Sequence, residues 1–272
     1  MEKQLVLKHE ELNLTATLHY PTGGDVSGGK NQAIIICHGF VGSRIGVDRL
    51  FVKAARALAA AGSYVLRFDY GGCGESDGNY GELGLESMIA QTRTAIDYVA
   101  SMDAVDPQRI VLLGHSLGGA TALLTAVRDR RVKRLVLWSP VAYPFTDIVR
   151  IVSRAGYDEA IEKGSTDYTG YSLKPEFFNS LQEHQPFQDA KRFGGDVLLI
   201  HGTSDDVIPA DYSFLYQKVF WTRSEGICDK EIIFQANHTY STRKHQEEAI
   251  NVTRNWLSGL DRRHEEWHHW SI

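Results

Sequence analysis

Apolar residues in this chain fall into short, unbroken runs separated by stretches with helical periodicity. An apolar run of four or five residues without polar alternation is typical of a strand buried on both faces of a sheet. Strands of this type are expected at residues 33–37, 64–69, 110–114, 135–138 and 196–202. Because helices cover both faces of parallel sheets, this pattern predicts a mostly parallel sheet.

The stretches between these runs predict helices. Residues 48–61 are rich in Ala and Leu and are followed by Gly62, and residues 83–99 carry apolar side chains on one side at helical spacing. Residues 106–109 (D-P-Q-R) predict a turn. Other helices are expected at 117–127, 211–219 and 242–257. Three further strands complete a predicted eight-stranded sheet and lie at 6–9, 14–20 and 231–235.

Residues 141–190 interrupt this alternation of strand and helix. They contain no clear strand run, but 8 of these 50 residues (16%) are aromatic, against 10% for the whole chain. Because they lie between two predicted sheet strands, we expect a small inserted cap rather than a second domain or a linker. The core of the single domain is then formed by residues 1–140 and 191–272.

Composition narrows the classes of function. The chain has 272 residues, with 29 Lys and Arg against 34 Asp and Glu, so it lacks a broad basic field for nucleic acid. No apolar run is long enough to span a membrane, and the N-terminus lacks the apolar core of a secretory signal. The three Cys residues are widely spaced, and Cys73 lies in a loop that we expect to be exposed. This cysteine pattern indicates neither a disulfide framework nor a metal pair, and we expect a cytoplasmic protein.

The segment I-V-L-L-G-H-S-L-G-G (110–119) is the most specific local pattern. It contains G-x-S-x-G from Gly114 to Gly118, where a predicted strand becomes a predicted helix. Such a sharp turn leaves no room for side chains two positions on either side of the serine, which accounts for the glycines. The turn also lifts the hydroxyl of Ser116 above the end of the sheet. Ser116 is therefore a candidate nucleophile, which needs a base to remove its proton.

Together with three other motifs in the same order, this segment resembles the α/β-hydrolase superfamily over about residues 30–260. The other motifs are I-C-H-G-F (36–40), R-F-D-Y-G-G-C-G-E-S-D-G (67–78) and H-G-T-S-D-D-V-I-P (201–209). The resemblance implies the α/β-hydrolase fold, with helices on both faces of a mostly parallel eight-stranded sheet. It also implies the chain order nucleophile, acid, base.

The resemblance points to specific residues for the acid and the base. By register with the family pattern H-G-x-x-D, Asp205 rather than Asp206 is the acid, which would orient the imidazole of the base. Of the 11 histidines, His238 is the implied base because it follows the last predicted strand. We expect roles in packing or loop hydrogen bonding for three other histidines in motif loops, His38, His115 and His201.

A tetrahedral intermediate also needs backbone N–H donors for its oxyanion. The amide of Leu117, directly after the nucleophile, is one expected donor, and the resemblance implies the amide of Phe40 as the other. The segment H-E-E-W-H (264–268) matches a zinc-binding pattern, but it lies in a terminal tail without a downstream third ligand beyond His269. We therefore expect neither a metal nor a cofactor.

A serine nucleophile predicts acyl transfer to water through an acyl-enzyme, so we expect a serine carboxylesterase that acts on a small-molecule ester. The motifs and the cap resemble bacterial cinnamoyl and feruloyl-type esterases, which implies hydroxycinnamoyl esters as substrates. The cap aromatics either suit an aryl acyl group or form the core of the cap itself. Two other functions stay open: a peptidase or acylaminoacyl hydrolase of the prolyl-oligopeptidase branch, and a non-catalytic binding protein. The sequence also leaves open a homodimer.

Overall fold

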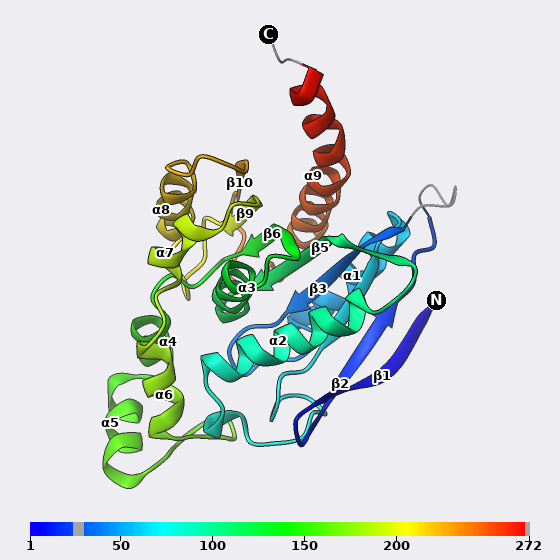
Figure 1. Cartoon of the computed structure of the whole chain (residues 1–272). Coiled ribbons are helices and arrows are strands. Elements are labelled where there is room, and N and C mark those ends of the chain that lie inside the picture. The colour runs from blue at the N-terminus through cyan, green and yellow to red at the C-terminus, as the bar shows by residue number, and fades with distance from the viewer. Residues whose placement is uncertain (24–29, 270–272) are drawn as a thin grey trace.

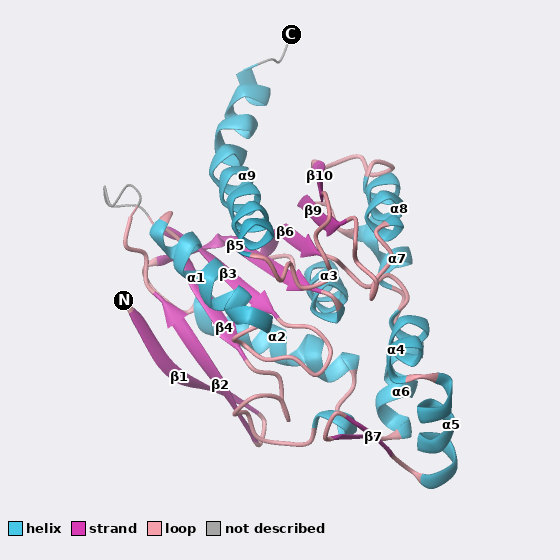
Figure 2. Ribbon diagram, turned by 180° about the vertical axis from the view of Figure 1, so that it is seen from behind, coloured by secondary structure: helices cyan, strands magenta, loops and turns pink. Residues whose placement is uncertain are grey.

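The structure is a computed structural model that describes residues 1–23 and 30–269, except for the side chains of 261, 262 and 264–269. Eight strands form one sheet in the order β1-β2-β4-β3-β5-β6-β9-β10 (Figures 1 and 2). β2 is antiparallel to both of its neighbours, β1 and β4, and all other neighbouring strands are parallel. The predicted mostly parallel, eight-stranded sheet is therefore confirmed.

The strands of the sheet are β1 (Glu2–His9), β2 (Leu12–His19), β3 (Asn31–Cys37), β4 (Tyr64–Phe68), β5 (Val105–His115), β6 (Val132–Trp138), β9 (Asp196–Gly202) and β10 (Cys228–Ile233). The helices that follow strands β3, β4, β5, β9 and β10 are α1 (Leu50–Ala60), α2 (Leu85–Ala100), α3 (Leu117–Arg128), α8 (Asp211–Phe220) and α9 (Arg243–His269). Short 3-10 turns lie at Val47–Arg49, Tyr80–Glu82 and Ala190–Arg192.

Helices cover both faces of the sheet, which explains the unbroken apolar runs. Successive residues of a strand point to opposite faces. Ile35 and Leu112 therefore pack into the core beneath α2, α3 and α8, whereas Ile34 and Val111 pack into the core beneath α1 and α9. Figures 1 and 2 show these two layers from opposite sides.

Several predicted boundaries are shifted, and the two largest differences lie in β5 and α9. Residues 106–109 were expected to form a turn but lie within β5, where the pairing with β3 shifts register between Asn31 and Ala33. The last helix was expected to end at Leu257, with the H-E-E-W-H segment in a tail after it. Instead α9 continues through that segment to His269, whose side chain lies outside the described residues.

Between β6 and β9 the chain forms a group of small elements. They are α4 (Pro144–Val152), α5 (Arg154–Lys163), β7 (Thr166–Tyr168), β8 (Tyr171–Leu173), α6 (Pro175–Gln182) and α7 (Pro186–Asp189). Three of these helices begin with proline, whose fixed φ and missing N–H suit the first turn of a helix. Figure 1 shows α4, α5 and α6 gathered at one end of the molecule. The role of residues 141–190 as a cap stays a prediction.

Many aromatic residues of this segment pack against one another. Phe177 and Phe178 are fully buried, and the ring of Tyr157 lies 5.3 Å from the rings of both Phe145 and Phe178. These rings continue into the main core, because the ring of Phe177 lies 5.3 Å from that of Tyr80 and 5.7 Å from that of Phe40, both outside the segment. Tyr171 differs, because it lines the same pocket as Ser116.

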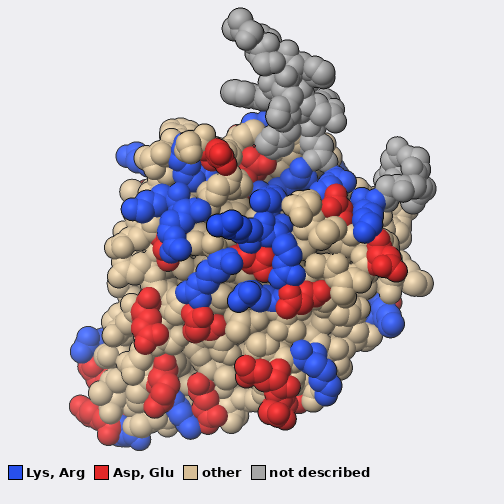
Figure 3. All heavy atoms as spheres, viewed as in Figure 1, with Lys and Arg blue, Asp and Glu red and all other residues tan. Residues whose placement is uncertain are grey.

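Charge is unevenly distributed over the surface. Figure 3 shows basic side chains gathered on the upper part of one face and acidic side chains below them. The end of α3 and the chain directly after it are rich in Arg and Lys. Some of these side chains are paired: Arg128, the last residue of α3, contacts Glu86, and Arg131 contacts Asp97 and Asp129. Within the described part of the chain, no helix combines the length and the apolar character needed to cross a membrane.

Candidate active site

The topology of the sheet determines where a site can form. β3 and β5 are neighbours in the sheet. The chain continues from β3 to β4 on one side of this pair and from β5 to β6 on the other side. Connections that diverge in this way leave a crevice at the carboxyl ends of the two strands. The loop that follows β3 and the turn that follows β5 meet there, and Ser116 lies in that turn.

Ser116 lies between β5 and α3 with φ 58° and ψ −124°, a conformation that is unfavourable for a residue with a side chain. A Cβ atom on Gly114 would lie 2.3 Å from the carbonyl oxygen of Gly118. A Cβ atom on Gly118 would lie 2.2 Å from the carbonyl oxygen of Cys37, in the neighbouring strand. Only glycine therefore fits at these two positions, as the sequence pattern requires.

Asp205 lies in the loop after β9, and its side chain is fully buried. Its Oδ1 accepts hydrogen bonds from the amides of Val207 and Ile208, at 3.0 and 2.8 Å. These two bonds fix one edge of the carboxylate and turn the other edge toward the loop that follows β10. Asp206, the neighbouring candidate acid, is exposed.

His238 lies in that loop, and its Nδ1–H donates to Oδ2 of Asp205 at 2.7 Å. In the neutral imidazole this leaves Nε2 as a hydrogen-bond acceptor. Burial by itself raises the pKa of Asp205, but hydrogen bonds from His201 and His238 outweigh it and hold the pKa well below its usual range. The backbone carbonyl of His238 accepts a hydrogen bond from Nε2–H of His115 at 2.8 Å, and burial lowers the pKa of His115 to about 3.

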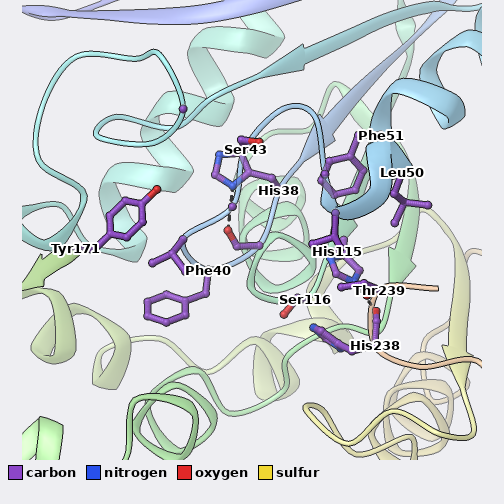
Figure 4. Close-up of a pocket in the computed structure, with 16 residues that line it drawn as sticks. His38, Phe40, Ser43, Leu50, Phe51, His115, Ser116, Tyr171, His238 and Thr239 are labelled. Atoms are coloured by element: carbon purple, nitrogen blue, oxygen red, sulfur yellow. Dashed lines mark hydrogen bonds between the residues drawn. The ribbon is translucent and has the colours of Figure 1, made fainter. Parts of the chain in front are cut away.

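Ser116 and His238 line the same pocket of about 510 Å³ (Figure 4). One wall comes from the loop after β3 and the start of α1, and Tyr171 reaches the pocket from β8. Several lining residues are large and apolar or aromatic: Phe40, Val41, Val47, Leu50, Phe51 and Tyr171. The pocket can therefore bury an apolar group next to a serine and an imidazole.

The two expected backbone donors flank Ser116. Leu117 is the first residue of α3, and Phe40 follows Gly39 in the loop after β3. A Cβ atom on Gly39 would lie 3.0 Å from Cβ of Ser116, so this loop runs close to the serine. Among the described residues, neither amide has a hydrogen-bond acceptor. Both amides thus remain able to bind an oxyanion.

A buried ion pair supports the loop after β3, and the sequence did not reveal it. The guanidinium of Arg44 contacts the buried carboxylate of Asp69 and also pairs with Glu75. Arg67 donates from Nη1 to the carbonyl oxygen of Arg44 at 2.6 Å. Asp69 and Glu75 lie in the 67–78 motif, but no sequence signal connects Arg44 with them.

The glycine-rich loop is folded more tightly than expected. Cys73 was predicted to be exposed, but it is only 1% exposed, and burial raises the pKa of its thiol to about 12. A thiol with such a pKa is unreactive. A Cβ atom on Gly74 would lie 2.2 Å from the Asp69 carboxylate, which shows how closely the loop wraps this side chain.

Comparisons with known proteins agree with this architecture. Residues 32–156 match the sequence model of the alpha/beta hydrolase fold family. An uncharacterised protein of Mycobacterium tuberculosis is 34% identical over 188 residues, which cover 69% of this chain and 57% of that protein. The quorum-quenching protein AidA of Acinetobacter baumannii is 35% identical over 116 residues, which cover 42% of this chain and 36% of AidA. The chain thus spans about half the length, or less, of these relatives.

Solved structures match nearly the whole chain. Est1E from Butyrivibrio proteoclasticus, solved with ferulic acid bound, matches with a TM-score of 0.79 and 25% sequence identity. The match covers 93% of this chain and 97% of the Est1E chain. Alpha/beta hydrolase domain-containing protein 10 from mouse has a TM-score of 0.70 and 21% identity, covering 95% and 99%. The chain therefore has the α/β-hydrolase fold, and its motif-bearing residues 32–156 resemble that family in sequence as well.

Proposed function

We propose that this protein is a serine carboxylesterase in which Ser116 is the nucleophile, His238 the general base and Asp205 the acid that orients it. The observation that carries the proposal is the 2.7 Å hydrogen bond from His238 to the fully buried carboxylate of Asp205. His238 lines the same pocket as Ser116, which lies in a strained turn. Strain of this kind is typical of a nucleophile that must project from a sheet.

The reaction follows from the roles of these groups. Nε2 of His238 accepts the proton of the Ser116 hydroxyl as its oxygen attacks the ester carbonyl, and Asp205 stabilises the imidazolium that forms. The amides of Phe40 and Leu117 donate to the oxyanion of the tetrahedral intermediate. His238 then gives the proton to the leaving alcohol, and an acyl-enzyme remains. Water activated by the same imidazole releases the acid.

We further propose that the acyl group is aromatic, with hydroxycinnamoyl (feruloyl) esters as the substrate class. The aromatic side chains of Phe40, Phe51 and Tyr171 line the pocket beside Ser116 and offer faces on which a phenyl ring can pack. The likeness to Est1E, which was solved with ferulic acid bound, supports the same choice. A cytoplasmic location is also proposed, supported by three cysteines that are all unpaired.

A substrate panel tests this proposal. Methyl ferulate and methyl p-coumarate are expected to have a higher kcat/KM than methyl esters of straight-chain acids of similar size, because the pocket wall is aromatic. Hydrolysis of p-nitrophenyl acyl esters of increasing chain length provides the comparison series. Inert methyl ferulate together with a sharp short-chain optimum would reject the feruloyl assignment and keep the esterase. Turnover of aminoacyl amides without turnover of esters would instead favour a peptidase.

A further inference from the structure

The carboxylate of Asp205 receives hydrogen bonds from two imidazoles, not one. Oδ2 accepts from Nδ1–H of His238 at 2.7 Å and from Nε2–H of His201 at 3.1 Å. We propose that His201 is a positioning residue for the reaction, which acts by holding Asp205 in the orientation that His238 needs. This inference rests on the proposed function, in which Asp205 orients the base.

The surroundings of His201 determine which of its nitrogens carries a proton. Nε2 faces two acceptors, Oδ2 of Asp205 and the carbonyl oxygen of Ile208 at 3.0 Å, so it must carry the proton. Nδ1 lies 2.7 Å from the hydroxyl of Ser213, which can donate to it. In this tautomer Nδ1 can accept a hydrogen bond from Ser213, so the hydroxyl stabilises the form that points an N–H at the carboxylate.

This arrangement is completely shielded from water. The side chains of His201 and Asp205 are both fully buried, as is Ser213. His201 lies in β9, and Ser213 lies in α8, which packs beside it. Two secondary-structure elements of the core therefore fix the imidazole, whereas Asp205 itself lies in a loop.

With His201 in place, the carboxylate has a full set of partners. The amides of Val207 and Ile208 occupy Oδ1, and His201 and His238 share Oδ2. Without His201, Oδ2 would lose one of its two hydrogen-bond donors, and because the side chain of Asp205 is fully buried, bulk water could not replace it. The carboxylate could then rotate to recover a partner, and its bond to His238 would weaken. A small misplacement of a group that orients a base lowers the rate without changing ground-state binding.

Two substitutions of the same residue test the proposal. The His201→Leu protein lacks the N–H donor, whereas in His201→Gln the side-chain amide can place an N–H close to the position of Nε2. We expect kcat for p-nitrophenyl acetate to fall about 10–100-fold in His201→Leu, with KM within about 3-fold. In His201→Gln we expect kcat to stay within about 5-fold of the parent, because the donor is restored. A residue needed only for packing would not show this rescue.

Proton NMR supplies a readout that does not depend on turnover. The His238 Nδ1–H in its bond to Asp205 should give a downfield signal, identified by its absence in His238→Gln. We expect the signal in the parent and in His201→Gln, and its loss or broadening in His201→Leu. Unchanged kcat and an unchanged signal in a folded His201→Leu protein would overturn the proposal.

A gentler variant covers the case in which His201→Leu does not fold. Ser213→Ala keeps the imidazole but leaves its buried Nδ1 without the hydroxyl that holds the ring in place, and we expect kcat to fall about 3–10-fold with KM unchanged. Parental kcat in Ser213→Ala would then overturn the proposal. Ser116→Ala, measured in parallel, separates the two hypotheses. Parental turnover in Ser116→Ala would reject the proposed function, and the role of His201 with it. Loss of turnover in Ser116→Ala, with parental kcat in the His201 and Ser213 variants, would reject the role of His201 alone.

Discussion

Replacing Ser116 with alanine is expected to lower kcat for p-nitrophenyl acetate by on the order of 10⁴-fold or more, with little change in KM. The substitution removes the attacking oxygen but keeps the pocket and the two backbone donors. The remaining turnover should reflect binding and the oxyanion donors alone. Steady-state kinetics over a range of enzyme concentrations measure the effect.

The matched control for this substitution is Ser101→Ala, at an exposed serine directly after α2. It removes the same hydroxyl far from the pocket, so parental kinetics are expected. Both proteins should unfold at temperatures close to that of the parent. Parental activity in a folded Ser116→Ala protein would rule out Ser116 as the nucleophile.

The second large effect is expected at Asp205. In the Asp205→Asn protein the asparagine oxygen would still accept the hydrogen bonds from the amides of Val207 and Ile208. The NH2 group would then point at Nδ1 of His238. That nitrogen would then have to accept a hydrogen bond, which places the proton on Nε2, where it cannot take one from Ser116. We expect Asp205→Asn to lower kcat by roughly 10⁴-fold, the cost of the wrong tautomer.

Asp206→Asn offers a control with the same chemical change one residue away. Asp206 is exposed, and we expect its substitution to change kcat less than 2-fold, as is usual for a surface side chain away from a site. The two proteins are compared by kcat and by thermal unfolding. Equal kcat values for Asp205→Asn and Asp206→Asn would show that the acid lies elsewhere.

The parts of the fold that could be predicted are those determined by local chemistry. The apolar runs at 33–37 and 110–114 mark strands because two covered faces require apolar residues at every position. Gly114 and Gly118 mark the turn around Ser116 because a Cβ atom there would collide with the backbone. In both cases the constraint acts on a few neighbouring residues.

Other features depend on contacts that the sequence does not display. The D-P-Q-R segment favours a turn by composition, but it lies in β5, where a shift of register in the pairing with β3 accommodates it. The strands β7 and β8 have three residues each, too few to show a period. Cys73 is buried because its loop folds back onto the core, where Tyr171 packs against Tyr80.

The candidate site also contains residues that the sequence could predict and contacts that it could not. Ser116, Asp205 and His238 could be selected because each follows a predicted strand and the three have the chain order nucleophile, acid, base. The partnership of His201 with Asp205 could not, although they are only four residues apart, because it depends on which way an imidazole in β9 turns. The pairing of Arg44 with Asp69 likewise joins two loops that are far apart in the sequence.

Covalent labelling tests the central claim most directly. A fluorophosphonate reacts with a serine that an adjacent base activates, and it leaves a stable adduct. We predict one adduct per chain by intact-protein mass spectrometry, located on Ser116 by peptide mapping, and none in the Ser116→Ala protein. An adduct on another residue, or an unlabelled protein that still hydrolyses esters, would contradict the account.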